Sequence, residues 1–257
     1  MKESELQVRI GKLDLAGRGD FYGTEQKVCY VTGANPALAG GAGTDGVFWG
    51  APGSDSHRFY ERQLKGYKES KTNVDERVGD AIKTPHYSAS QGSPSNHYLI
   101  HAIAPDSTVG GEERKKKLKK VYGNILDEAI KLKSVRLVLP DVGNGIFGDD
   151  SNDPIEIACA VIKKKEKKLI EARVSIDLIS HVSTNVEAWE QVAGKKTINF
   201  TALDLSAEDK QEKEKEKEKE KEEKEEKEKE EKEEKEKEEQ EEKEREEKER
   251  EEQEEKE

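Results

Sequence analysis

Two glycine-rich segments, each directly after a short apolar run, constrain the fold of this chain more than any other feature. Residues 35–46 follow the apolar run 28–31, and residues 140–148 follow the apolar run 135–139. Glycines let a backbone approach an anion closely, and the N-terminus of a helix after such a loop offers unpaired N–H groups and a favourable dipole. Two such loops at strand ends predict a site that clamps one diphosphate.

The first loop also carries Asn35 and Asp45, an amide and a carboxylate that a simple turn does not need. It is not a Walker A loop, because no Gly-Lys-Ser/Thr closes it, and its glycines lack the G-x-G-x-x-G spacing of a dinucleotide-binding loop. A plain glycine-rich connection, with Asn35 capping a turn and Asp45 capping a helix, is the alternative. The presence of the second loop favours the phosphate-binding interpretation.

Strand-like and helix-like segments alternate, which predicts an α/β fold with a mostly parallel sheet covered by helices on both faces. We expect strands at 6–15, 28–32, 99–104, 135–139 and 174–182, and helices at 45–65, at 112–133, from Asp153 and from Thr184. Residues 184–187 (Thr-Asn-Val-Glu) form a capping-box pattern that predicts the start of the last helix. Ligands on such sheets lie outside the carboxyl ends of the strands, where both glycine loops fall.

The C-terminal segment differs in composition from the rest of the chain. Residues 211–257 consist of 28 Glu, 16 Lys or Arg and 3 Gln, so they carry the whole formal net charge of −12. We therefore expect one domain at 1–205 and a low-complexity tail at 206–257. Glu-to-Lys pairs four residues apart favour a single charged helix, whereas the strict alternation at 212–219 favours disorder. Either tail would be a spacer or solubilising arm able to contact other proteins.

Several function classes are disfavoured by the remaining composition. Residues 1–210 are formally neutral, which argues against nucleic-acid binding through bulk charge. Cys29 and Cys159 lie in apolar runs and predict buried thiols in a reducing compartment, and no residue spacing suggests zinc. We expect no metal and no cofactor. Without a signal-peptide pattern or a membrane-spanning segment, the sequence predicts a cytoplasmic or nuclear protein.

Five motifs occur in a fixed order along the chain. They are residues 19–21 (Gly-Asp-Phe), 32–35 (Thr-Gly-Ala-Asn), 40–46 (Gly-Gly-Ala-Gly-Thr-Asp-Gly), 97–105 (His-Tyr-Leu-Ile-His-Ala-Ile-Ala-Pro) and 143–148 (Gly-Asn-Gly-Ile-Phe-Gly). In order and spacing they resemble the macrodomain, an ADP-ribose-binding fold in three layers with a mostly parallel mixed sheet. The resemblance covers about residues 5–200 and is greatest to the MacroD-type mono-ADP-ribosyl hydrolase branch, because Asp45 lies ten residues after Asn35.

The resemblance implies a role for each matching residue. Asn35 would bind the distal ribose, and Asp45 would activate or orient water near its anomeric carbon. Asp20, with Asp14 as the competing choice, would accept a hydrogen bond from the adenine amino group. Phe147 would cover the distal ribose. The remaining ligand-binding residues that the resemblance implies are Phe21, Gly41, Gly43, Gly46, Gly143, Asn144, Gly145 and Ile146.

Two main functions remain open at this point. The first is hydrolysis of mono-ADP-ribose from acidic side chains of modified proteins, or of a related ADP-ribose ester, with Asn35 and Asp45 as catalytic residues. The alternative is a non-catalytic reader of ADP-ribosylation, because Trp49 stands four residues after Asp45, where the hydrolase branch has histidine. A scaffold whose tail is the functional part is a third possibility. ADP-ribose and mono-ADP-ribosylated proteins are the expected partners.

Overall fold

The computed structural model describes residues 5–12, 27–41, 43–88, 92–133, 135–144, 153–180 and 182–202. The chain divides into the units Met1–Leu203 and Asp204–Glu257, and every described residue belongs to the first unit. The predicted tail, 206–257, lies outside the described residues, so its limits and its state stay predictions. The account below concerns the first unit alone.

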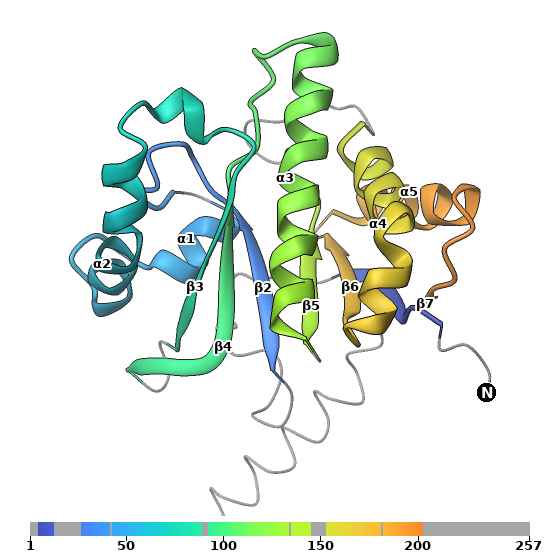
Figure 1. Ribbon diagram of the computed structural model, residues 1–257, viewed down its shortest axis with the longest axis horizontal. Helices are drawn as coiled ribbons and strands as arrows, with labels where there is room; N and C mark the ends of the chain where they lie inside the picture. Colours follow the sequence, from blue (N-terminus) through green and yellow to red (C-terminus); the bar gives the residue numbers. More distant parts are fainter. Residues whose placement is uncertain are drawn as a thin grey trace, which may run out of the picture. The chain divides into compact units, whose positions relative to one another are not determined.

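A seven-stranded sheet forms the centre of the described unit (Figure 1). Its strands are β1 (Val8–Lys12), β2 (Val28–Gly33), β3 (Ala81–Ser88), β4 (Ser93–Ala102), β5 (Arg136–Pro140), β6 (Ser175–Ser180) and β7 (Thr201–Ala202). Their order across the sheet is β3-β4-β2-β5-β6-β1-β7. Only β3 and β4 pair antiparallel, and every other neighbouring pair is parallel. The predicted mostly parallel mixed sheet is therefore confirmed.

Helices cover both faces of this sheet. They are α1 (Thr44–Trp49), α2 (Asp55–Ser70), the 3₁₀ helix η1 (Val74–Arg77), α3 (Gly111–Leu132), α4 (Asp153–Glu171) and α5 (Ser183–Lys195). Figure 1 shows α3 and α4 side by side in front of the sheet, and α5 packs against α4, β1 and β6. On the other face, α1 contacts β2 and α2 contacts β3. The predicted three-layer arrangement is thus confirmed.

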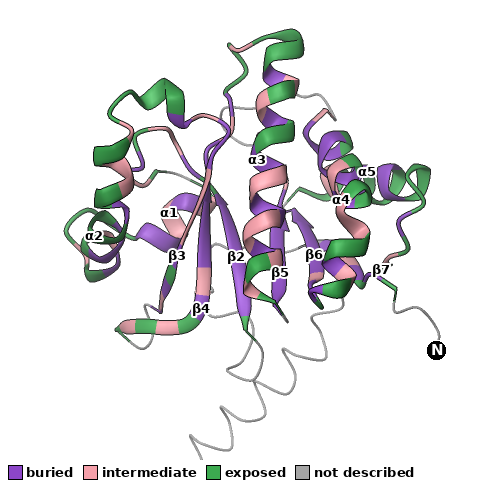
Figure 2. Cartoon of the chain, in the orientation of Figure 1, coloured by how far each residue is buried: buried purple, intermediate pink, exposed green. Residues whose placement is uncertain are grey.

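Strand β2 shows how the sequence divides between the two faces. Cys29 and Val31 belong to the apolar cluster shared with α3 and α4, whereas the Tyr30 ring lies 5.5 Å from that of Phe48 in α1. Successive side chains of a strand point to opposite faces, so a strand buried on both faces must be apolar throughout. Figure 2 accordingly shows β2 buried along most of its length and α3 exposed on its outer side.

Several predicted elements need correction. The expected helix at 45–65 is two helices, because the connection after α1 contains Pro52 and two glycines with positive φ, Gly50 (65°) and Gly53 (82°). The predicted capping box is wrong, since α5 already begins at Ser183 and its N-cap makes no side-chain hydrogen bond. Strands β3 and β7 were not expected, and β4 begins six residues before the predicted start.

The two cysteines are buried, as expected from the sequence. Cys29 and Cys159 are free and buried, and burial raises the pKa of the Cys159 thiol to about 12. Thiols with a raised pKa carry little reactive thiolate at neutral pH. Within the described ranges, none of the helices combines the length and the apolar character needed to cross a bilayer.

Candidate ligand-binding site

Two loops meet at the carboxyl edge of the sheet because their strands are neighbours. Strand β2 ends at Gly33 and runs parallel to β5, which ends at Pro140. The described part of the loop after β2, residues 34–41 and 43, is called loop 1 below, and the described start of the loop after β5, residues 141–144, is called loop 2. This edge is where open parallel sheets bind ligands. The structure therefore places the first glycine-rich segment and the described start of the second after neighbouring parallel strands.

Loop 1 is folded around the Asn35 side chain. Its amide Nδ2 donates to the Gly40 carbonyl at 2.6 Å, and its backbone carbonyl accepts from the Leu38 N–H at 3.0 Å. Leu38 is buried and has φ of 51°, a left-handed conformation that is unusual for leucine. Loop 1 therefore holds a strained backbone that surrounding contacts must maintain.

Asn35 and Asp45 converge on Gly41. A Cβ atom added to Gly41 would lie 3.5 Å from Asn35 Nδ2 and 3.7 Å from Asp45 Oδ2. A Cβ on Gly46 would lie only 2.4 Å from the Gly41 carbonyl oxygen, so that position accepts glycine alone. The absence of side chains at these two glycines thus lets an amide and a carboxylate approach the same small region of backbone.

Asp45 is a buried carboxyl group in the first turn of α1, with 2% of its surface exposed. Its Oδ1 lies 3.4 Å from the Thr32 hydroxyl, which also lies 3.2 Å from the Thr44 hydroxyl. Burial raises the pKa of Asp45 to about 7, against opposing effects of the Thr32 hydroxyl and the Trp49 indole. Asp45 can therefore exchange a proton near neutral pH, as a general base or acid must.

Trp49 lies one helical turn after Asp45 and is almost fully buried. Its ring packs against Gly40, where an added Cβ would lie 3.2 Å from the Trp49 side chain. The same ring lies 5.2 Å from that of His57 and 5.9 Å from that of His101. The indole therefore packs Gly40 of loop 1 against α2 and β4.

Two buried oxygen atoms of the side chains that meet at Gly41 have no hydrogen-bond partner among the residues that the structure describes. They are Asn35 Oδ1 and Asp45 Oδ2. Buried polar side-chain atoms are normally paired, because an unpaired one costs about 1–3 kcal/mol. Two unpaired acceptors on the side chains at Gly41 favour a site for a polar ligand that donates hydrogen bonds.

Helix α3 holds loop 2 through two hydrogen bonds to its main chain. The Gly143 carbonyl accepts from Arg114 Nη2 at 2.9 Å, and the Val142 carbonyl accepts from the Tyr122 hydroxyl at 2.8 Å. Gly143 has φ of 90°, and an added Cβ would lie 2.7 Å from Leu118 Cδ2. Position 143 therefore requires glycine. The next residue, Asn144, donates its backbone N–H to the Asp141 carbonyl at 3.0 Å.

The structure places only some of the predicted site residues. Asn35, Gly41, Gly43, Asp45 and Gly46 lie together in loop 1 and α1, and Gly43 is the N-cap of α1 with φ of 64°. Gly143 and Asn144 lie in loop 2. The other five predicted residues, Asp20, Phe21, Gly145, Ile146 and Phe147, lie outside the described residues, as does the competing Asp14.

Sequence reasoning did not assign a role to Thr32 or Arg77. Thr32 faces Asp45 from the end of β2, and Arg77 donates to the carbonyl of Pro36 at 3.0 Å.

His101 is not a candidate base, because burial lowers its pKa to about 3 and its Nε2 lies 3.1 Å from the Thr84 hydroxyl. Among the described residues no group of three His, Cys, Asp or Glu side chains is arranged to hold a metal.

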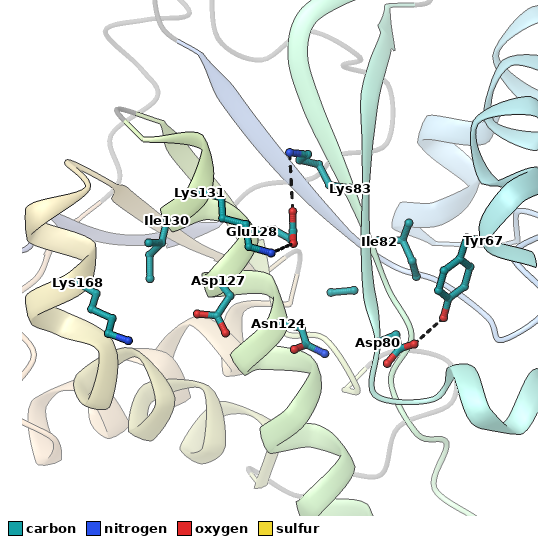
Figure 3. Close-up of a pocket in the computed structure, with 11 residues that line it drawn as sticks. Tyr67, Asp80, Ile82, Lys83, Asn124, Asp127, Glu128, Ile130, Lys131 and Lys168 are labelled. Carbon is teal, nitrogen blue, oxygen red and sulfur yellow. Dashed lines mark hydrogen bonds and ion pairs between the residues drawn. The ribbon is translucent and has the colours of Figure 1, made fainter. Parts of the chain in front are cut away.

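Two hollows lie away from the loops. One, of about 570 Å³, lies between β3 and the second half of α3 (Figure 3). The other, of about 730 Å³, lies at the amino ends of β1, β5 and β6 and contains Arg9, Arg136 and Asp177. Neither is lined by a residue of loop 1 or loop 2. The candidate site therefore rests on the loops and not on these hollows.

Comparison with known proteins identifies the fold. The model of the Macro domain family matches residues 31–158. A macro domain-containing protein of Listeria monocytogenes serotype 4b is 30% identical over 148 residues, which cover 57% of this chain and 77% of that protein. The chain belongs to the macro domain family. A macro domain-containing protein of Cupriavidus necator is 26% identical over 134 residues, 52% of this chain and 71% of that protein.

Solved macrodomain structures share the fold. A variant of the Oceanobacillus iheyensis macrodomain with ADPR matches with a TM-score of 0.53 and 18% identity, over 76% of this chain and 96% of that one. The Trypanosoma brucei macrodomain in complex with ADP matches with a TM-score of 0.51 and 20% identity, over 73% of this chain and 69% of that one. At these identities the likeness establishes the macro domain fold of this chain.

Proposed function

We propose that this macro domain binds ADP-ribose at the carboxyl edge of its sheet and hydrolyses mono-ADP-ribose esters of acidic side chains. The observation that carries the proposal is the convergence of Asn35 and Asp45 on Gly41, with an unpaired oxygen on each side chain among the described residues. Related macrodomain structures hold ADPR and ADP, which supports the choice of ligand. In this proposal loop 2 binds the diphosphate, and Asp20 and Phe21 bind adenine.

The proposed reaction uses Asp45 as general base. Its carboxylate removes a proton from a water molecule, and the water oxygen forms a bond to the anomeric carbon of the distal ribose. The bond from that carbon to the oxygen of the modified side chain breaks, and the electron pair leaves with the side-chain carboxylate. Asn35 would orient the ribose through its free amide oxygen. The products are ADP-ribose and the unmodified acidic side chain, so the substrate is a mono-ADP-ribosylated protein.

The buried carboxyl group sets the expected pH dependence. A general base works in its ionised form, and the pKa of Asp45 is raised to about 7 by burial. The release rate should therefore increase as pH rises through 7 and level off above it. Asp45 differs here from an exposed carboxylate, which is already ionised at pH 5.

The proposal is tested with the full-length chain and the isosteric substitution Asp45→Asn. Calorimetry with ADP-ribose measures binding, and a release assay on a protein mono-ADP-ribosylated on glutamate measures turnover. We expect binding within a few-fold of the wild type and release reduced by about 10²-fold or more, the size of general base catalysis. The exposed Asp55, also in a helix first turn, provides the control substitution Asp55→Asn. Unchanged release by Asp45→Asn would exclude the assigned role.

A substitution at Gly41 tests the position of the ligand. Gly41→Ala introduces a methyl group between Asn35 and Asp45 at ordinary contact distances, so the fold should persist. A ligand that occupies this region would meet the methyl group, and ADP-ribose affinity should fall about tenfold or more. Gly66→Ala in α2 is the matched control, since nothing lies within 4 Å of an added Cβ there. Equal ADP-ribose affinity in both variants would place the ligand elsewhere.

A non-catalytic reader is the second candidate, and the position of Trp49 favours it. The indole packs one turn below Asp45, and only 2% of the Asp45 surface is exposed. A buried carboxyl group enclosed by an indole has little room for an attacking water. A reader would bind ADP-ribose and release nothing from any linkage, and the substitution Trp49→His would then be the one to test for recovery of turnover.

A further inference from the structure

Arg77, the last residue of η1, is a buried arginine bound to the main chain on three sides. Its Nε donates to the Lys71 carbonyl at 2.8 Å, its Nη2 to the Lys68 carbonyl at 3.2 Å and its Nη1 to the Pro36 carbonyl at 3.0 Å. Only 5% of Arg77 is exposed. The guanidinium therefore joins the end of α2 to loop 1.

The location of this charge has a clear electrostatic basis. A buried cation is costly unless its environment compensates it. Lys68 lies in the last turn of α2 and Lys71 is its C-cap, so their carbonyls are among those left unpaired at a helix C-terminus, where the helix dipole favours positive charge. Two of the three contacts thus stabilise the charge at the end of α2. The third contact is made to loop 1.

The loop 1 contact fixes the residue directly after Asn35. Pro36 is the second residue of the turn that the Leu38 N–H closes onto the Asn35 carbonyl. The positive φ of Leu38 makes this turn unfavourable by itself, so it persists only where neighbouring groups hold it. On one side the Trp49 ring packs against Gly40. On the other side Arg77 holds Pro36, and the direction of the Asn35 side chain depends on both.

Helix α3 in turn holds the segment that carries Arg77. Lys120 Nζ donates to Asp80 Oδ1 at 2.7 Å, and Asn124 Nδ2 donates to the Gly79 carbonyl at 3.0 Å. The Tyr67 hydroxyl of α2 donates to the other oxygen of Asp80 at 2.7 Å, as Figure 3 shows beside the hollow. The turn after η1 is therefore attached to α2 and α3 together.

A different stripe of α3 holds loop 2. Arg114, Leu118 and Tyr122, spaced four residues apart, contact the Gly143 carbonyl, the Gly143 Cα region and the Val142 carbonyl. Residues spaced by four lie on one side of a helix. One helix thus supports both loops, loop 2 directly and loop 1 through the turn 78–80 and Arg77.

We infer that Arg77 is a positioning residue of the ligand site, which holds Asn35 of loop 1 at a fixed place relative to loop 2. The inference rests on the proposed function for its consequence in binding. Arg77 is buried and donates to three main-chain carbonyls, so it acts through Asn35 and not on the ligand. Loss of the guanidinium should weaken contacts to the distal ribose more than contacts to the adenosine half.

The test uses Arg77→Met, with Arg62→Met as the matched control at an exposed arginine of α2. Calorimetry compares ADP-ribose with AMP, which lacks the distal ribose. We expect ADP-ribose affinity to fall roughly tenfold in Arg77→Met, a typical result of losing a charged hydrogen bond, while AMP affinity changes less than about twofold. Equal losses for both ligands would indicate general destabilisation and overturn the inference.

Two further measurements keep the result decisive. Arg77→Lys keeps the charge but cannot reach three carbonyls, so it should show the same selective loss in a more stable protein. Hydrogen exchange at the Leu38 amide reports on loop 1 without any ligand and should accelerate in both Arg77 variants relative to Arg62→Met. If the wild type binds no ADP-ribose, the proposed function fails, while unchanged Leu38 exchange would overturn the positioning role of Arg77.

Discussion

The two faces of the sheet are built from different residues. On the side of α3, α4 and α5 the sheet contributes aliphatic side chains such as Ile100, Leu137 and Ile176 to one continuous apolar cluster. On the side of α1 and α2 the buried residues include aromatic rings and histidines beside aliphatic residues such as Leu64, Leu99 and Val138. Their ring contacts join Tyr30, Phe48, Trp49, Phe59, Tyr60, His86, His97 and His101.

The two faces therefore contribute differently to stability and to ligand binding. Aliphatic side chains bury area without any polar requirement, so the strand side chains of the first face supply stability at no electrostatic cost. The second face buries Asp45 and His101, each with one polar atom unpaired among the described residues. Such groups cost stability and are retained at sites where chemistry or binding needs them. The candidate site therefore lies over the polar face, and the apolar face offsets its cost.

The largest effect is expected on the aliphatic face. Ile176 in β6 is fully buried in the apolar cluster, so Ile176→Ala should lower the free energy of unfolding by about 2–5 kcal/mol. Urea denaturation measures this loss, and Val74→Ala, at an exposed valine, is the control. ADP-ribose affinity of the folded protein should stay within about threefold. A tenfold loss of affinity would show that the two faces are not separate.

On the polar face, removing the charge of Asp45 should stabilise the protein above neutral pH. The folded state keeps the Asp45 proton up to about pH 7, whereas an unperturbed aspartic acid has a pKa of 3.8, so ionisation favours unfolding as pH rises between these values. Asp45→Asn should therefore gain a few kcal/mol at pH 8, with about 4 as the upper limit, and nothing at pH 4.

Urea denaturation of Asp45→Asn and the wild type between pH 4 and pH 8 gives this difference directly. Asp55→Asn is the control, since Asp55 is exposed and its substitution should change stability little at any pH. A stability difference between Asp45→Asn and the wild type that does not grow with pH would mean that burial of Asp45 carries no electrostatic cost. The polar face would then not differ from the aliphatic one in this respect.

The sequence predicted the parts of the fold that depend on local pattern. Buried parallel strands such as β2 and β5 are short apolar runs, and α3 repeats its apolar residues at helical spacing, so both kinds of element were found. Strand β3 was missed because it contains Pro85 and mixes polar with apolar residues. Such a strand is tolerated because β3 is at the edge of the sheet and pairs with β4 alone.

The candidate site was only partly predictable. Asn35, Asp45 and the glycines stand in one loop, and their spacing in the chain indicated their common role. Arg77 gives no such signal, because its partner Pro36 lies 41 residues away and is recognised through a main-chain carbonyl. The raised pKa of Asp45 was equally hidden, since it arises from burial of the carboxyl group in the folded chain.

A smaller effect is expected at Thr84, which supports His101 on the polar face. Thr84→Val keeps the shape of the side chain but removes the hydroxyl that lies 3.1 Å from His101 Nε2. His101 is neutral, with a pKa lowered to about 3, and its ring would then have an additional unpaired nitrogen. We expect a loss of about 1–2 kcal/mol in urea denaturation at pH 8.

Thr84→Ser is the matched control, because it keeps the hydroxyl and loses only a methyl group. ADP-ribose affinity should be unchanged in both variants. If Thr84→Val were as stable as the wild type, the hydroxyl would contribute nothing to holding His101. Burial of this histidine on the polar face would then not require that hydrogen bond.

The smallest effect is expected at Thr32, which touches the site from β2. Its hydroxyl lies 3.4 Å from Asp45 Oδ1 and opposes the rise of the Asp45 pKa. Thr32→Val should therefore raise that pKa further, and the midpoint of the pH–release profile should move up by less than about one pH unit.

A carboxyl titration followed by NMR would report the same change in a protein without turnover. Thr44→Val is the control, since the Thr44 hydroxyl contacts the Thr32 hydroxyl, and among the described residues no hydrogen bond joins it to the Asp45 carboxyl group. A downward shift in Thr32→Val would mean that the hydroxyl stabilises the protonated acid, so that the polar face holds Asp45 as a proton donor and not as a base.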